Sequence, residues 1–275
     1  MTEPHAIENI ANYNDGMRRS LIDKIFFADK IQDADLIIDY GCADGSLIKF
    51  LAAIFPEQQF IGYDISTDMI QEAKKGNGHP NAVFEGNWDL INGAILKAQS
   101  QGKRVCVVLS SMIHEVYAYG AKQADEFWER IWAIGADYIA IRDMMVSRTT
   151  SRPADPLSVA RVRQIFPSDL LAQWETQWGT IEENWSLVHF LLTYRYTANW
   201  DRELRENYLP LNLEDFMSLV PPTYSPTFIE HYTLPFLRGE IWRDFYIQLQ
   251  DPTHFKAIYR KVKTPPRPLT VVRQH

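Results

Sequence analysis

Cysteine, long apolar runs and an excess of basic residues are all scarce in this 275-residue chain. Two cysteines are too few for the disulfide framework of a small secreted protein, so the composition favours a reducing cytoplasm. No apolar stretch approaches the roughly 20 residues that a membrane-spanning helix needs. The first residues show no basic region followed by an apolar one, so we expect neither a signal peptide nor a membrane partner.

The charge balance is acidic, with 28 lysines and arginines against 35 aspartates and glutamates and a net charge of −7. Broad, non-specific binding to nucleic acid needs a basic surface, so a small-molecule partner fits this balance better. The net charge does not reveal a local basic patch, so binding to nucleic acid is not excluded. We find no internal repeat and no low-complexity tract, and no feature of the sequence indicates an oligomeric state.

Apolar strand patterns alternate with helical patterns over the first half of the chain. Strands are expected at 36–40, 60–63, 83–85, 105–109 and 138–141, and helices at 46–55, 66–75, 89–100 and 122–134. This alternation predicts an α/β fold, with a parallel sheet wound on both faces. Helical spacing over 6–31 predicts an N-terminal helical segment, and two late strands at 228–234 and 254–260 would bring the sheet to seven.

The alternation of strand and helix patterns ends after the fifth expected strand. We predict a core of residues 1–145 and 227–263, a helical substrate or lid insertion at 146–226, and a flexible tail at 264–275. Five of the eight tryptophans fall between positions 174 and 242. These aromatic side chains either stack on a substrate ring or form the core of the insertion. The mixed charges of 201–208 indicate a solvated helix face.

The most informative motif joins the first expected strand to its helix. It reads Asp39-x-Gly41-x-x-x-Gly45 and has a second carboxylate at Asp44. This spacing differs from the G-x-G-x-x-G of dinucleotide sites. Carboxylates would repel a pyrophosphate but suit a cationic amino-acid group. Asp64, which ends the next strand, suits the hydroxyls of a ribose.

Three segments, 39–45, 62–66 with Met69, and 86–88, resemble the first three motifs of class I S-adenosylmethionine-dependent methyltransferases. The resemblance covers roughly residues 30–145 and implies a Rossmann-like, doubly wound, mostly parallel sheet of seven strands. It implies S-adenosyl-L-methionine as cofactor. It also implies that Asp39 orients the methionine part of the cofactor and that Asp64 holds the ribose.

The resemblance assigns further cofactor contacts. The turn that lets the backbone approach the cofactor would consist of Gly41, Cys42, Ala43 and Gly45. The adenine would meet Ile65, Met69, Asn87 and Trp88. The methionyl end would lie near Ser110 and Ser111, and two residues of the N-terminal segment, Tyr13 and Arg18, would close over the cofactor.

Candidate catalytic residues follow the fourth and fifth expected strands. His114 is the best candidate for a general base because histidine titrates near neutral pH, although His114 and Glu115 could instead begin a helix and bond locally. Arg142 either holds an anionic substrate group or pairs with Asp143. The remaining histidines and the cysteines lack metal-ligand spacing, so no metal site is predicted.

These features predict O- or N-methylation of a small molecule by in-line transfer. Two alternatives remain open at this point. One is a methyltransferase acting on an RNA end or a modified nucleotide. The other is a cofactor-binding scaffold that has the methyltransferase fold without catalysis.

Overall fold

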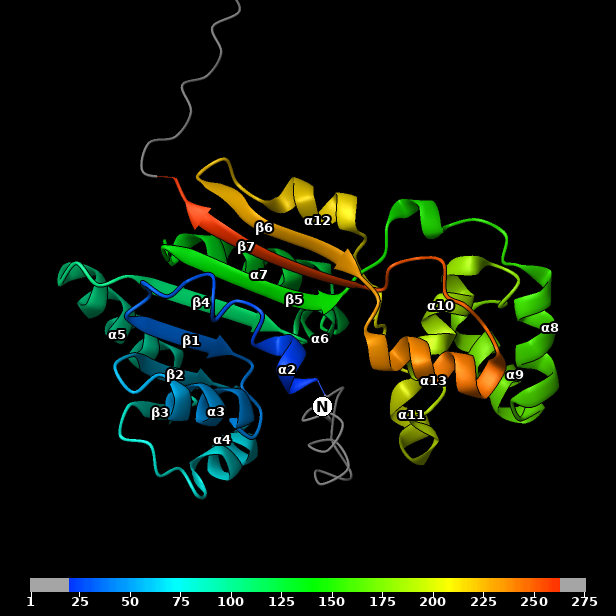
Figure 1. The fold of residues 1–275 in the computed structure, drawn as a ribbon, viewed down its shortest axis with the longest axis horizontal. Helices are drawn as coiled ribbons and strands as arrows, with labels where there is room; N and C mark the ends of the chain where they lie inside the picture. The colour runs from blue at the N-terminus through cyan, green and yellow to red at the C-terminus, as the bar shows by residue number, and fades with distance from the viewer. Residues whose placement is uncertain (1–19, 263–275) are drawn as a thin grey trace, which may run out of the picture.

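A sheet of seven strands forms the centre of the computed structural model, which describes residues 20–262 (Figure 1). The strands are β1 (Leu36–Tyr40), β2 (Gln59–Tyr63), β3 (Ala82–Glu85), β4 (Val105–Ser110), β5 (Tyr138–Met144), β6 (Tyr224–Tyr232) and β7 (His254–Lys261). Their spatial order is β3-β2-β1-β4-β5-β7-β6. The first five run parallel, and β7 lies antiparallel to both β5 and β6. The predicted α/β architecture is confirmed.

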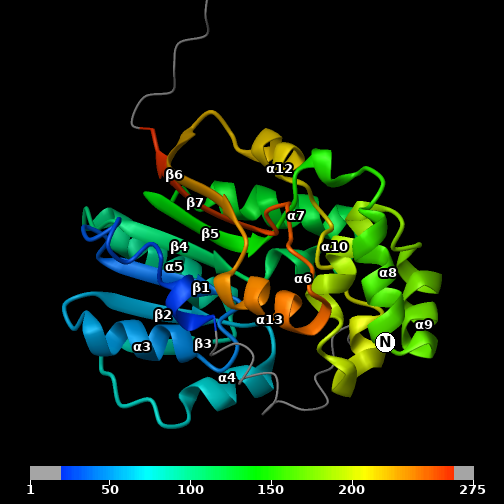
Figure 2. The same cartoon turned by 45° about the vertical axis from the view of Figure 1, so that its right-hand side comes forward.

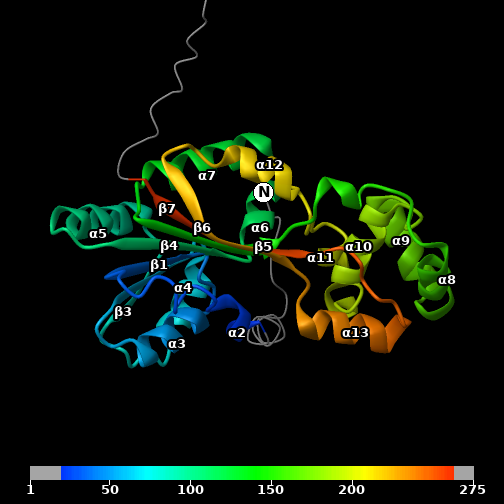
Figure 3. The ribbon, with the colours of Figure 1, turned by 45° about the horizontal axis from the view of Figure 1, so that its top comes forward.

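Helices cover both faces of this sheet (Figure 3). One face carries α2 (Leu21–Lys24), α3 (Ser46–Ile54) and α4 (Thr67–Lys74). The other carries α5 (Trp88–Ser100), α6 (Ile113–Ala118), α7 (Ala121–Ala133) and α12 (Leu213–Leu219). A strand covered on both faces needs apolar residues at every position, and all six residues of β4 are buried.

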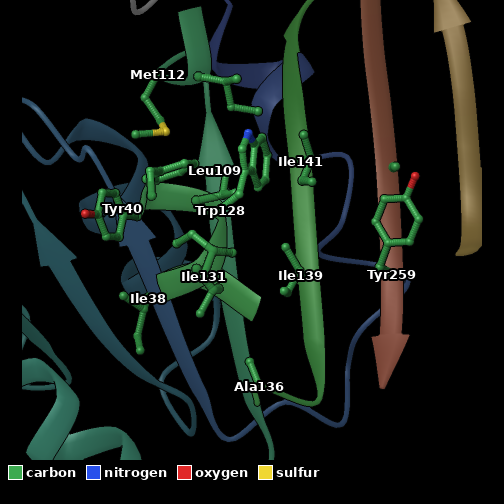
Figure 4. Packing of buried hydrophobic residues seen from close by; sticks show 14 of the residues in the cluster. Ile38, Tyr40, Leu109, Met112, Trp128, Ile131, Ala136, Ile139, Ile141 and Tyr259 are labelled. Carbon is green, nitrogen blue, oxygen red and sulfur yellow. The ribbon is translucent and has the colours of Figure 1, made fainter. Parts of the chain in front are cut away.

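Packing on the α7 face shows why the central strands are apolar. Leu109 of β4 and Ile139 and Ile141 of β5 lie against Trp128 and Ile131 of α7 (Figure 4). All of these side chains are at most 3% exposed. The candidate functional residues lie at the carboxyl ends of these packed strands.

A group of helices lies beyond the carboxyl ends of β4 and β5 (Figures 1 and 2). It contains η1 (Arg148–Thr150), α8 (Pro156–Ile165), α9 (Ser168–Trp178), α10 (Asn184–Thr193), η2 (Thr197–Asn199) and α11 (Trp200–Glu203). Trp174 and Trp200 are buried in its hydrophobic cluster, as the core interpretation of the aromatic residues predicts. The helix α13 (Pro235–Phe245), between β6 and β7, packs into the same cluster through Leu237 and Ile241.

Two local predictions need adjustment. The fifth strand continues to Met144, so Arg142 and Asp143 lie inside it, where Arg142 pairs with Lys256 of β7. Of the predicted N-terminal helix at 6–31, the described residues contain only α2, and the turns that follow it bury Phe27 and Ile31. Residues 1–19 and the predicted tail lie outside the described part of the chain.

Cys42 and Cys106 are buried free thiols, and burial raises the pKa of each. Within residues 20–262, every helix is too short or too polar to cross a membrane.

Candidate functional site

The loop after β1 is shaped by three residues with positive φ: Gly41 at 82°, Ala43 at 46° and Gly45 at 72°. The backbone N–H groups of Gly41 and Cys42 both donate to the carbonyl of Tyr63 at 2.8 Å. These two hydrogen bonds hold the loop against the end of β2. A Cβ added at Gly45 would meet the Phe84 ring and lie 3.1 Å from Ala73 Cβ, so the tight turn needs glycine there.

Asp64 connects this loop to the next helix. One carboxylate oxygen accepts from the backbone N–H of Ala43 at 2.9 Å and the other from that of Ser66 at 2.9 Å. The first bond holds Ala43 in a conformation that alanine rarely adopts. A carboxylate has about four acceptor positions, so a carboxylate that accepts two backbone bonds can also accept from ligand hydroxyls.

A small cavity of about 20 Å³ lies beside the loop, lined among others by Lys24, Asp39, Asp44 and Ser110. Burial raises the pKa of Asp39 to about 7, against the opposing charge of Lys24. Burial also lowers the pKa of Lys24 to about 8, and Asp39 opposes that change. The Ser110 hydroxyl is buried and has no hydrogen-bond partner among the described residues, so this cavity contains a polar group that a ligand could satisfy.

The residues expected to meet an adenine lie along the ends of β2 and β3. Ile65 is 80% exposed, whereas Met69 is buried. Trp88 packs against Tyr40 and Tyr63, with ring centroids 5.3 and 5.4 Å apart. The side-chain oxygen of Asn87 accepts from Asp89 N–H at 2.9 Å and caps α5.

A larger cavity of about 290 Å³ opens between the sheet edge and the helical group. The sequence candidates His114, Glu115, Arg142 and Ser111 all contribute to its wall. From the helical group come Arg195, Tyr196, Arg202, Glu203, Glu206 and Tyr208. The topology therefore brings the predicted catalytic residues together with residues from the insertion.

His114 is held between two carboxylates. Its Nδ1 lies 2.8 Å from Asp143 Oδ1, and its Nε2 lies 3.4 Å from Glu206 Oε1. Burial alone would lower the pKa of His114, but Asp143 and Glu206 raise it to about 10. A protonated imidazole cannot accept a proton, so this environment suits His114 as a fixed positive charge rather than a base. His114 and Glu115 lie in the first turn of α6, as the alternative predicts, but the bond of His114 to Asp143 is not local, because it joins residues 29 positions apart.

Glu115 is the better proton acceptor in this arrangement. Burial raises its pKa to about 7, and the neighbouring His114 opposes that change while Glu206 adds to it. A base titrating near neutral pH is matched to proton transfer under ordinary conditions. The side chain is partly exposed, and it lines the larger cavity.

Arg202 is the main counter-charge of the carboxylate cluster from the insertion. Its guanidinium lies 2.8 Å from Glu206, 3.5 Å from Glu203 and 3.9 Å from Glu115. The prediction that 201–208 forms a solvated face is wrong, because Glu203 and Glu206 are each 1% exposed. Burial, together with Glu206, raises the pKa of Glu203 to about 7.

The ligand atoms of His114, Glu115 and Glu206 all lie within 4.8 Å of one another, a spacing that a metal ion could bridge. Sequence spacing did not suggest this grouping, because Glu206 comes from the insertion. The Arg202 guanidinium already lies against two of the three residues.

Arg142 is 4% exposed and pairs with Asp23 of α2 at 2.8 Å rather than with Asp143. It also donates to the Ser111 hydroxyl. Arg142 therefore connects α2 to the turn after β4. The predicted contacts of Tyr13 and Arg18 lie outside the described residues.

Sequence reasoning assigned no role to Lys24, Glu203 or Glu206. The i, i+3 spacing of Glu203 and Glu206, with Arg202 four residues before Glu206, was a usable signal, because it puts all three on neighbouring helical positions. The mixed charges of that segment favoured solvent instead. Lys24 stands in a helical pattern that offered no reason to single it out.

A family model of known proteins matches part of the sheet core. Residues 37–133 match the family model described as a methyltransferase domain. The match covers about a third of the chain, and it agrees with the seven-stranded sheet and with the resemblance of its edge motifs to class I S-adenosylmethionine-dependent methyltransferases.

The similarity to an individual curated protein is confined to a short stretch of the chain. Malonyl-(acyl-carrier protein) O-methyltransferase of Legionella pneumophila is 33% identical over 61 residues, which cover 22% of this chain and 20% of that protein. The chain thus matches about a fifth of the length of this curated relative.

Two solved structures illustrate the structural similarity. An S-adenosylmethionine-dependent methyltransferase from Anabaena variabilis is 13% identical, with a TM-score of 0.48 over 93% of this chain and 96% of that one. Human N-acetylserotonin methyltransferase, solved with S-adenosylmethionine, is 11% identical, with a TM-score of 0.49 over 92% of this chain and 54% of that one.

Proposed function

We propose that this protein transfers a methyl group from S-adenosylmethionine to an oxygen or nitrogen of a small molecule. The observation that carries the proposal is the juxtaposition of two cavities at one sheet edge. The first is lined by Asp39 and the unpartnered Ser110 hydroxyl, and the second by Glu115 and His114. Ligands of parallel sheets bind at this edge.

The donor set of the first cavity fits the cofactor. Asp39 would take the α-ammonium of the methionine end, and Asp64 would accept from the ribose hydroxyls. Ile65 and Met69 would pack on the adenine, with Asn87 and Trp88 beside it. When bound, S-adenosylmethionine supplies a methyl group on a positively charged sulfur, and the excess of carboxylates at this edge would favour that charge.

The second cavity would hold the acceptor. A volume of about 290 Å³ matches the lower end of small-molecule pockets, and the helical group forms one wall of the cavity. Glu115 would accept the proton of the attacking group, while protonated His114 would hold the Glu206 carboxylate in place. Arg142 and Ser111 would shape the wall nearest the cofactor. The acidic net charge favours a small molecule over an RNA end.

The proposal includes a domain organisation and a cellular location. Residues 146–212, together with α13, would form the unit that selects the acceptor, and the methyltransferase core would be completed by α12, β6 and β7. Two buried free thiols fit a reducing cytoplasm.

A melting experiment tests the cofactor part. S-adenosylmethionine or S-adenosylhomocysteine at about 100 times its dissociation constant should stabilise the protein by about 2.7 kcal/mol. Asp64→Ala should abolish this ligand-induced shift, whereas Asp68→Ala, an exposed aspartate four residues away, should retain it. Absence of any shift in the wild-type protein would refute the proposal. A shift without transfer to any acceptor would instead favour the scaffold alternative.

A further inference from the structure

Arg195 follows the end of α10 and lines the larger cavity together with Tyr196 and Phe236. Its guanidinium carbon lies 5.1 Å from the centre of the Tyr196 ring and 5.7 Å from that of the Phe236 ring. Through Nη1, Arg195 donates to Glu240 of α13. Burial would lower the pKa of Arg195, but Tyr196 and Glu240 raise it, so the guanidinium is charged.

One donor of Arg195 is unused. Its Nε–H is buried and has no hydrogen-bond partner among the described residues. The side chain as a whole is 21% exposed and lines the cavity, so a ligand there can reach the guanidinium. A buried donor without an acceptor is unfavourable in a folded protein, and the planar fork of arginine matches the oxygens of a carboxylate or a phosphate.

His254, the first residue of β7, offers a second donor in the same cavity. Its Nδ1 lies 2.9 Å from Oγ1 of Thr253. The Thr253 hydroxyl is fully buried, and Nδ1 is the one acceptor that its proton meets among the described residues. A buried hydroxyl proton needs an acceptor, so Thr253 donates to Nδ1. A neutral imidazole then carries its own proton on Nε2, which has no hydrogen-bond partner within residues 20–262.

The charges around His254 keep its imidazole neutral. Burial lowers the pKa of His254 well below its usual value, and the charges of Arg142 and Arg195 lower it further. Lys256 and His114 act in the same direction. This side of the cavity is therefore electropositive, and an anion bound beside His254 would be attracted by the same charges.

The carboxylates of the cavity are gathered at another place. The three glutamates in its wall lie between 2.8 and 3.9 Å from the guanidinium of Arg202. They are Glu115, Glu203 and Glu206. The cavity therefore has a carboxylate side around Arg202 and a cationic side at Arg195.

We propose that the methyl acceptor carries an anionic group, a carboxylate or a phosphate, which binds to the Arg195 guanidinium and to the Nε2–H of His254. This inference rests on the proposed function and names the class of its acceptor. The atom that receives the methyl group would lie at the carboxylate side, near Glu115. Tyr196 and Phe236 flank the guanidinium and would pack against the apolar body of the acceptor. The rival interpretation is that Arg195 serves only as the ion-pair partner of Glu240.

Three small probes test the proposal on the wild-type protein, in complex with S-adenosylhomocysteine. Benzoate and phenyl phosphate carry the two anionic groups, and benzamide is the neutral analogue of benzoate. In calorimetric titrations, the preferred anion should bind on the order of tenfold to a hundredfold more tightly than benzamide, and the comparison of the two anions identifies the group that the site prefers. Equal affinities for the three probes, or no binding of either anion up to about 10 mM, would overturn the proposal.

Variants then locate the anion site. Arg195→Met should weaken binding of the preferred anion on the order of tenfold to a hundredfold and leave benzamide binding within about twofold. His254→Phe should weaken the anion about twofold to tenfold, and it provides a test of the site that does not depend on the folding of Arg195→Met. The matched control is Arg205→Met, which removes the same charge from an exposed position of the insertion outside the cavity wall and should leave all affinities unchanged.

The rival interpretation predicts a different pattern. Arg195→Met would then lower the stability of the protein and leave the ratio of anion to benzamide affinity as in the wild type, which would refute the proposal. Equal weakening of anion and benzamide would reduce Arg195 to shaping the cavity. If the wild-type protein does not bind S-adenosylhomocysteine, the proposed function fails, and the same titrations without that ligand still decide whether Arg195 and His254 bind an anion.

Discussion

Nδ1 of His114 lies 2.8 Å from Oδ1 of Asp143, and both side chains are at most 5% exposed. Asp143 also accepts from the backbone N–H groups of Ile113 and Met144, each at 2.7 Å. Burial would raise the pKa of Asp143, but His114 and these bonds keep it below its usual value. The raised pKa of His114 therefore favours the protonated imidazole near neutral pH, and the bonds of Asp143 to His114 and to the Ile113 N–H hold the start of α6.

The charged state of His114 makes the stability of the fold depend on pH. Its folded pKa of about 10 lies above the ordinary 6.5, so the stabilisation is fully present below pH 6.5 and is lost as pH rises towards 10. His114→Asn keeps a donor near Asp143 but does not titrate. We expect the stability difference between the two proteins to shrink by on the order of 2–4 kcal/mol between pH 6 and pH 10. Parallel curves from urea unfolding at these pH values would show that His114 is neutral.

Glu115 is expected to set the pH dependence of turnover. Its pKa of about 7 means that the reactive, ionised form accumulates as pH rises through 7. Glu115→Gln should lower turnover about 10²–10⁴-fold and remove this rise. The assay is transfer of a labelled methyl group to an acceptor found by screening. Glu129→Gln, an exposed glutamate on α7, is the matched control and should be silent. An unchanged pH profile in Glu115→Gln would eliminate Glu115 as the base.

Removing Arg202 should leave buried carboxylates without their counter-charge. Arg202→Met is expected to destabilise the protein by about 3–5 kcal/mol. The loss should be larger at pH 8 than at pH 6, because the pKa values of Glu115 and Glu203 near 7 keep both groups protonated at the lower pH.

The control for this change is Arg243→Met, which removes an exposed pair with Asp244 and should cost less than about 1 kcal/mol. Thermal or urea unfolding at both pH values provides the comparison. A loss for Arg202→Met that is independent of pH would mean that the two glutamates do not titrate in this range.

The turn after β1 should tolerate no side chain at Gly45. Gly45→Ala combines a positive φ with contact against Phe84 and Ala73, and we expect a loss of about 2–4 kcal/mol. Gly93→Ala, at an open position within α5, should instead stabilise the protein by up to about 1 kcal/mol. Both values follow from equilibrium unfolding in urea. A neutral Gly45→Ala would show that the loop is not packed against Phe84.

The strands of the sheet and the motif at its edge could be predicted because the residues that define them are adjacent in the sequence. The apolar run before Asp39 and the glycine spacing after it predict a strand, a tight turn and a helix from adjacent residues alone. Arg142 and Asp143 were placed after the fifth strand because polar residues normally end a buried strand. Pairing with Lys256 and Phe255 of β7, more than a hundred residues later, extends the strand through them.

The acceptor side could be predicted only in part. His114 and Glu115 were found from their position after the fourth strand. Glu206 approaches His114 only through the packing of the insertion, which buries a segment whose charge pattern resembles a solvated helix. Lys24 depends in the same way on three distant partners of Asp23.

A crystal structure grown with S-adenosylhomocysteine tests the central claim most directly. We expect the ribose hydroxyls within hydrogen-bond distance of the Asp64 carboxylate, and the amino-acid end beside Asp39 and Ser110 at the loop after β1. Ligand density away from the ends of β1 and β2, or no density at saturating ligand, would contradict it.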